Sequence, residues 1–139
     1  MSVLDSVKAI GAAILLMVAN VAVAFGVVAF YSFAIEPGRD ASFYQAAALG
    51  IAPWSSVVAG SLLFLAAMRW LAWRGARRNG YTFAATVAAI YAAVDLAVVA
   101  TQGMQALLAP VVAISIASKF AAALLGAWLS RPQALRQNR

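Results

Sequence analysis

The sequence predicts an all-α integral membrane protein, a four-helix bundle that forms a single domain over residues 1–139. Of the 139 residues, 65% are hydrophobic and only 10% are charged, whereas about 25% of a soluble domain is charged. Four apolar stretches are each near or above the roughly 20 residues that cross a bilayer. No polar stretch between them is long enough to form a separate water-soluble domain.

The first span is expected over residues 9–35. It ends at the turn 36–40, where a proline and a glycine break the helix. Lys8, the apolar run and the small residues 22–24 imitate a cleavable signal peptide, but the run continues well past the length of a signal segment. After the turn, Asp40 is a suitable N-cap for a short interfacial helix over about residues 41–50.

The second span is expected over residues 53–73, because Pro53 fits the first turn of a helix. The alternative is one kinked helix from about Phe43 to Trp73. The third span is expected over residues 81–101, after a short basic loop. The outer segment Phe43-Tyr44-Gln45 together with Trp54 is expected to act as an interfacial anchor, a docking surface for a partner, or a lid over an outward-facing cavity.

The fourth span is expected over residues 106–129, after a tight turn at 102–105. Pro110 falls in its first turns, where a proline is tolerated. Ser130, Arg131 and Pro132 are expected to end the helix, so that residues 131–139 form a polar cytoplasmic tail. At about 1.5 Å per residue the second span is about 31 Å long, which matches a hydrocarbon core about 30 Å thick.

The distribution of basic residues predicts the orientation of the bundle. Arg39 falls on one side of the membrane, Lys119 falls inside the fourth span, and the other basic residues fall on the opposite side. Because cytoplasmic loops carry the excess of Lys and Arg, both termini are expected in the cytoplasm (N-in/C-in). The residues on the cytoplasmic side are Lys8, Arg69, Arg74, Arg77, Arg78, Arg131, Arg136 and Arg139.

Asp95 and Lys119 are the two charged residues deep inside apolar segments. An ionised side chain in the bilayer centre costs about 2.5–3.5 kcal/mol on insertion scales, so such residues usually find a partner and often mark function. Counted along their helices, they lie about 22 Å and about 16 Å from the cytoplasmic side. We expect a buried ion pair, with three interpretations: a structural lock, a contact with another subunit, or a coupling site for transport.

Two further patterns accompany this pair. A polar seam is expected on the inner faces of the bundle, where interhelical hydrogen bonds form; its members are Asn20, Tyr91, Gln102 and Ser115. Small residues that allow close helix packing are Ser56, Gly60 and Gly126. They serve packing within one chain or a dimer interface.

The basic residues Arg74, Arg77, Arg78 and Arg131 form a cytoplasmic rim. This rim is a topology determinant or a site for anionic lipid headgroups. The chain contains no histidine and no cysteine, which removes the commonest metal ligands and proton shuttles. No catalytic motif is present, so we expect no enzyme, no cofactor, no metal and no nucleic-acid partner.

Several motifs resemble those of small four-span bacterial inner-membrane proteins that have no defined activity. They are Tyr44-Gln45 followed by Pro53-Trp54, the helix end 70–74, Asp95 in the third span, and Lys119 with residues 126–129 in the fourth. The resemblance implies a multi-pass protein of the bacterial inner membrane. We expect an accessory or assembly subunit, or a self-associating structural protein, with the bilayer and other membrane subunits as partners. The alternative is a small oligomeric transporter or channel that uses Asp95 and Lys119.

Overall fold

The computed structural model confirms an all-helical chain, and it describes residues 2–75 and 79–137. Four of the described helices are long and apolar enough to cross a membrane, as expected of a multi-pass membrane protein. The elements are α1 (Val3–Phe30), the π-helical continuation η1 (Tyr31–Ile35), α2 (Ala41–Gly75), α3 (Gly80–Ala100), the one-turn α4 (Met104–Leu107) and α5 (Pro110–Gln137).

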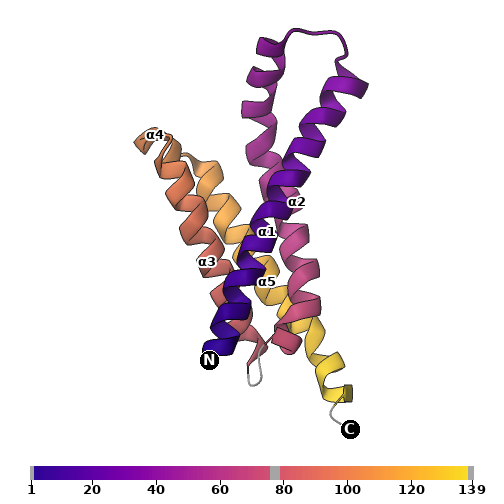
Figure 1. The fold of residues 1–139 in the computed structure, drawn as a ribbon, viewed down its shortest axis with the longest axis vertical. Coiled ribbons are helices and arrows are strands. Elements are labelled where there is room, and N and C mark those ends of the chain that lie inside the picture. The colour runs from indigo at the N-terminus through magenta and orange to yellow at the C-terminus, as the bar shows by residue number, and fades with distance from the viewer. Residues whose placement is uncertain (1, 76–78, 138–139) are drawn as a thin grey trace.

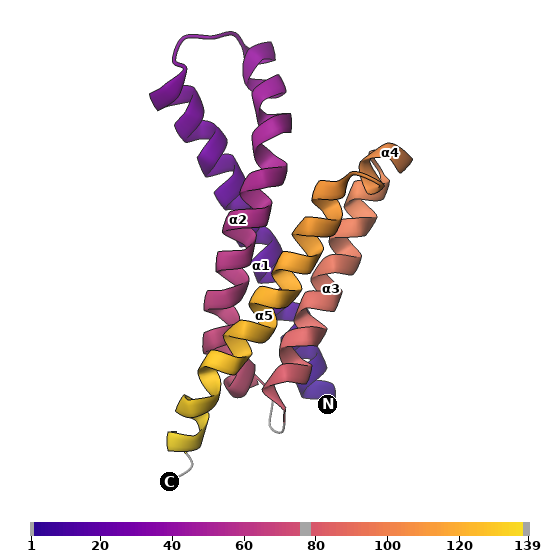
Figure 2. The ribbon, with the colours of Figure 1, turned by 180° about the vertical axis from the view of Figure 1, so that it is seen from behind.

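The helices form two arms that meet at one end of the molecule and separate at the other (Figure 1). One arm is the distal part of α1 with η1 and the beginning of α2. The second arm is the end of α3 with α4 and the beginning of α5. Seen from behind, α5 crosses over α2 in the half of the molecule where the arms meet (Figure 2), and α2 makes its most extensive contact with α5. Both termini lie at this convergent end.

Local capping explains where the helices begin. The side chain of Ser2 accepts a hydrogen bond from the backbone N–H of Asp5, and the Asp5 carboxylate accepts one from the backbone N–H of Ser2, which forms a capping box. Asn79 caps α3 by accepting from the N–H groups of Tyr81 and Thr82. The first helix therefore begins at Val3, earlier than the expected Ala9, whereas α3 begins within one residue of its predicted start.

Other predicted helix boundaries, around residues 50, 106 and 130, are wrong. The separate helix expected at 41–50 does not exist, because α2 runs without interruption from Ala41 to Gly75 and contains Pro53. The kinked-helix alternative came closer, since it treated this segment as one helix. At the other end, α5 continues through Pro132 to Gln137, so residues 131–137 are helical and do not form an extended tail. Its start at Pro110, later than 106, reflects a residue that lacks an N–H and suits a first helical turn.

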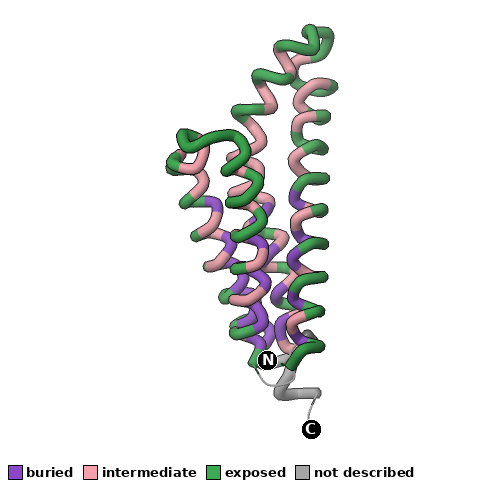
Figure 3. Tube along the Cα trace, turned by 60° about the vertical axis from the view of Figure 1, so that its left-hand side comes forward, coloured by how far each residue is buried: buried purple, intermediate pink, exposed green. Residues whose placement is uncertain are grey.

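The core fills only the convergent half of the molecule, where most of the buried residues gather (Figure 3). Its largest fully buried side chains are Phe64, Phe83, Lys119, Met68 and Val87. The other half carries mostly exposed apolar side chains. In a membrane these side chains face lipid, which is as apolar as they are.

Candidate functional site

A hydrogen-bond network joins three helices in the middle of the bundle. The amide nitrogen Nδ2 of Asn20 on α1 donates to Ser56 Oγ on α2 and to Tyr91 OH on α3, each over 2.9 Å. Asn20 and Tyr91 are both buried. The predicted participation of Asn20 in an interhelical hydrogen bond is therefore confirmed, and the network fixes the relative positions of α1, α2 and α3.

Lys119 on α5 enters the same network from the opposite side. Its side chain is only 2% exposed, and its ammonium donates to Ser56 Oγ over 3.1 Å and to Ser115 Oγ. The ammonium also lies 5.2 Å from the centre of the Tyr91 ring, within the range of a cation–π interaction. Two hydroxyls and an aromatic face thus surround the charge.

The contact ion pair predicted between Asp95 and Lys119 is not formed. No nitrogen–oxygen distance within 4.0 Å joins the two, and the one such ion pair among the described residues is Arg39–Glu36. The two charges remain near enough to interact electrostatically. The prediction compared only the depths of the two residues along their helices, which are similar. It could not fix the direction of the Lys119 side chain, whose ammonium points toward Ser56 and Ser115.

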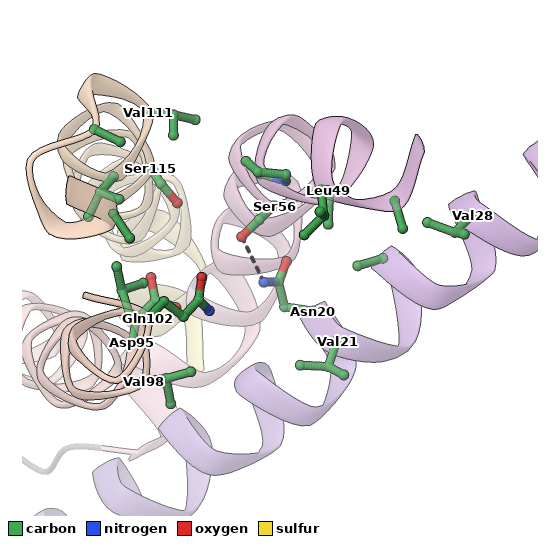
Figure 4. Close-up of a pocket in the computed structure, with 18 of the residues that line it drawn as sticks. Asn20, Val21, Val28, Leu49, Ser56, Asp95, Val98, Gln102, Val111 and Ser115 are labelled. Carbon is green, nitrogen blue, oxygen red and sulfur yellow. Dashed lines mark hydrogen bonds between the residues drawn. The ribbon is translucent and has the colours of Figure 1, made fainter. Parts of the chain in front are cut away.

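Asp95 instead lines a cavity of about 620 Å³ between the two arms, which we call the interarm cleft. Figure 4 shows Asp95 and Gln102 on one side of this cleft and Asn20 with Ser56 on the other. The closed end is polar and the walls are apolar. Residues at the closed end are Asn20, Ser56, Asp95 and Ser115; residues of the walls include Val21, Phe25, Leu49, Val98 and Val112.

The carboxylate of Asp95 has no hydrogen-bond or ion-pair partner in the part of the chain that the structure describes. The one fully buried side-chain polar atom without a partner in that part is Oδ1 of Asn20. The oxygens of Asp95 are therefore accessible from the cleft. An accessible carboxylate among apolar walls is a group that can receive a cation or a proton.

The other predicted site residues divide into two groups. Gln102 lies on the cleft wall, two helical turns beyond Asp95, and makes no contact with the network. Gly60 and Gly126 are confirmed as close-packing positions. A Cβ on Gly60 would lie 2.7 Å from Lys119 Cε, and one on Gly126 would lie 2.6 Å from the backbone oxygen of Leu65.

The basic rim is described only in part. The Arg74 guanidinium lies 5.4 Å from the centre of the Trp70 ring, and Arg131 is exposed. Both belong to the convergent end of the molecule. The predicted rim residues Arg77 and Arg78 lie outside the described residues.

Sequence reasoning missed the role of Ser56. Its hydroxyl accepts from both Asn20 and Lys119 and so joins α1, α2 and α5, although its small size had indicated only close packing. The available signal was that Ser56 is a polar residue inside a span, and that Asn20 and Lys119 are polar residues inside two other spans. The edge-to-face contact of Tyr91 with Phe64, with ring centres 5.0 Å apart, was also missed.

The cleft thus combines apolar walls with an accessible carboxylate, and it lies near a buried lysine that donates hydrogen bonds to two hydroxyls. Comparisons with protein-family models, curated proteins and solved structures returned no match, so the function is argued from this geometry.

Proposed function

We propose that this protein is a non-enzymatic, multi-pass protein of a bacterial inner membrane that binds a guest in the interarm cleft and acts as a small oligomeric transporter. The observation that carries the proposal is the unpartnered carboxylate of Asp95 in the cleft. Had Asp95 been paired with Lys119, a structural lock would have accounted for both residues. The sequence favoured an accessory subunit over a transporter, and we now propose the transporter first.

The cleft has the form of a binding site with access from one side. The network of Asn20, Ser56 and Lys119 closes it at the convergent end, and its volume lies in the range of small-molecule sites. Four helices rarely enclose a complete pathway, so transport requires self-association of the chain.

The proposed orientation is N-in/C-in, and it rests on the positive-inside rule. The convergent end then faces the cytoplasm and the cleft opens toward the outer leaflet. In this orientation Arg74 and Arg131 would belong to the cytoplasmic rim. The proposed bacterial inner-membrane location rests on the resemblance of the sequence motifs to small four-span proteins of that membrane.

A role as an accessory or assembly subunit is the second candidate. The unpartnered carboxylate of Asp95 also supports this role, because a carboxylate without a partner in its own chain can pair with a cation on another subunit. Against this, the two arms meet partway along the molecule, so the cleft does not run along its whole length (Figure 1). A complete spanning helix of another subunit therefore cannot pass through the cleft and can only lie along its open side.

Mild extraction of the tagged protein from its native membrane, followed by sizing and mass spectrometry, separates the two candidates. A homo-oligomer without a stoichiometric partner is the expected result for a transporter. A larger partner in fixed stoichiometry would replace that proposal with the accessory role. Flux measurements on proteoliposomes then compare the wild type with Asp95→Asn, which should lose transport while it retains its fold.

A further inference from the structure

The interarm cleft distinguishes between guests by charge, because only one of the two intramembrane charges faces it. Asp95 lines the cleft, whereas Lys119 does not and is only 2% exposed. The ammonium is directed toward Ser56, Ser115 and the ring of Tyr91. An anionic guest would therefore meet the accessible carboxylate before it reached the buried lysine. A cationic guest meets a free acceptor.

The walls of the cleft define the rest of the guest. Val21, Phe25, Leu49 and Val112 present apolar surface, so a hydrated inorganic ion would lose its water without replacement ligands. No group of three or more His, Cys, Asp or Glu side chains lies together among the described residues. A single carboxylate is a poor coordination site for a metal ion, but it is sufficient for one monovalent organic cation.

From these observations we infer that the interarm cleft binds lipophilic monovalent cations, in which one positive charge is joined to an apolar body. The charge lies beside Asp95 at the closed end, and the apolar body fills the space between the arms. Phe25, whose ring is exposed on the wall, offers an aromatic surface to such a guest. Lipophilic cations would be the substrate class of the proposed transporter. Calling the guest a substrate rests on the proposed function, whereas its binding in the cleft does not.

The test uses two probes of nearly the same shape and opposite charge, tetraphenylphosphonium and tetraphenylborate. Binding of each to the purified full-length protein in lipid nanodiscs is measured by equilibrium dialysis. Empty nanodiscs of the same lipid give the background from partition into the bilayer. We expect saturable binding of the phosphonium cation above this background and none of the borate anion.

Four variants assign the binding to the cleft. Asp95→Asn should weaken binding of the cation at least about tenfold, as expected when one side of a desolvated charge pair is removed, and Asp95→Glu should retain it. Ala52→Phe fills the cleft one turn from Ser56 and should block binding without a change of charge. Asp40→Asn removes an equal charge from the exposed turn before α2 and keeps an N-capping residue, so it should bind as the wild type does.

Unchanged cation binding in Asp95→Asn, equal binding of both probes, or no binding above the empty nanodisc would each overturn the inference. Sizing and thermal unfolding of every variant confirm that the fold is retained, and Ala52→Phe gives a result that does not depend on the tolerance of position 95. Because binding is measured without flux, cation binding by a protein that transports nothing would remove the transport proposal and leave the site standing.

Discussion

At the scale of single residues, the two intramembrane charges have different environments and should respond differently to substitution. Lys119 holds three helices together through Ser56, Ser115 and Tyr91, whereas Asp95 faces a cleft. A buried polar group is stabilised by the partners it meets, and its removal leaves those partners unsatisfied. Lys119 therefore contributes to the fold and Asp95 to the proposed function.

We predict that Lys119→Ala lowers the free energy of unfolding by about 2–5 kcal/mol, as large core truncations do, because it creates a cavity and removes the hydrogen bonds that Lys119 donates to Ser56 and Ser115. Lys119→Met keeps most of the side-chain volume and should cost less. Asp95→Asn should change stability by less than about 1 kcal/mol, since no contact partner is left unpaired. Unfolding titrations in mixed micelles measure all three values.

A loss of 3–5 kcal/mol in Asp95→Asn, the range for breaking a buried contact pair, would contradict this assignment. It would indicate that Asp95 and Lys119 form a contact pair in the membrane. The three variants share one background and one detergent system, so their differences do not depend on the absolute stability of the protein.

The residue scale is also where the sequence was least informative about the site. It placed Asn20, Tyr91 and Lys119 in the interior of the bundle, where the structure buries them, because a polar residue in an apolar run has few other places to lie. It did not predict which partner Lys119 selects. Depth follows from counting residues along a helix, but the rotation and the rotamer of a long side chain depend on neighbours from other helices.

At the scale of elements, α2 and α5 form the spine of the molecule. Gly126 lets the two backbones approach: a Cβ at this position would lie 2.6 Å from the oxygen of Leu65 and 3.0 Å from the nitrogen of Arg69. These are backbone atoms, which cannot move aside as a flexible side chain does. The packing of α5 on α2 therefore depends on the absence of a side chain at residue 126.

Gly126→Ala should consequently destabilise the protein by about 1–3 kcal/mol, the range for overpacking in a well-packed core. The matched control is Gly50→Ala, which lies in the partner helix α2 and has no atom within 4 Å of the added Cβ. That substitution should be neutral or stabilising by up to about 1 kcal/mol, because alanine favours the helix over glycine. Equal effects of the two substitutions on unfolding would exclude close packing as the reason for Gly126.

Trp73 forms a second connection between the same two helices. Its indole Nε1 donates to the backbone oxygen of Ala127 over 2.8 Å, and its ring meets Tyr81 edge to face at 6.0 Å. We predict that Trp73→Phe lowers the unfolding free energy by about 0.5–1.5 kcal/mol, mainly through the lost hydrogen bond. Trp70→Phe, at an exposed position on α2, should change it by less than about 0.5 kcal/mol. The same micelle titration compares them, and a larger effect at Trp70 would contradict the prediction.

The element boundaries show what a sequence pattern can and cannot resolve. The third helix was predicted to within one residue at its start, because its apolar run begins directly after a basic loop; the structure adds that Asn79 caps it. Pro53 and Pro132 were interpreted as a helix start and a helix end, but both lie inside helices. A proline interrupts one backbone hydrogen bond, and a helix continues past it when the surroundings satisfy the freed group. Those surroundings come from other helices in the folded structure, so the local sequence around each proline does not reveal them.

At the scale of the whole molecule, the separation of the arms follows from where the large and polar side chains fall. The convergent half contains Phe64, Phe83, Met68 and the network of Lys119, which bind the helices to one another. In the distal half the cleft is lined mainly by alanine and valine, and these offer little surface for contact between the arms. The core at one end and the cleft at the other thus both follow from how large and small side chains are distributed along the helices. The hydrophobic pattern of the sequence did not reveal this division.

The functional meaning of this shape depends on which end faces the cytoplasm. The chain has no cysteine, so single-cysteine variants report the exposure of one position each to a membrane-impermeant maleimide. Because basic residues concentrate at the convergent end, we predict that Ser42→Cys, in an exposed position at the start of α2, is labelled in intact cells. Arg74→Cys, exposed at the end of the same helix, should react only after the membrane is opened. The reverse pattern would turn the cleft toward the cytoplasm, and the carboxylate of Asp95 would then receive its guest from inside the cell.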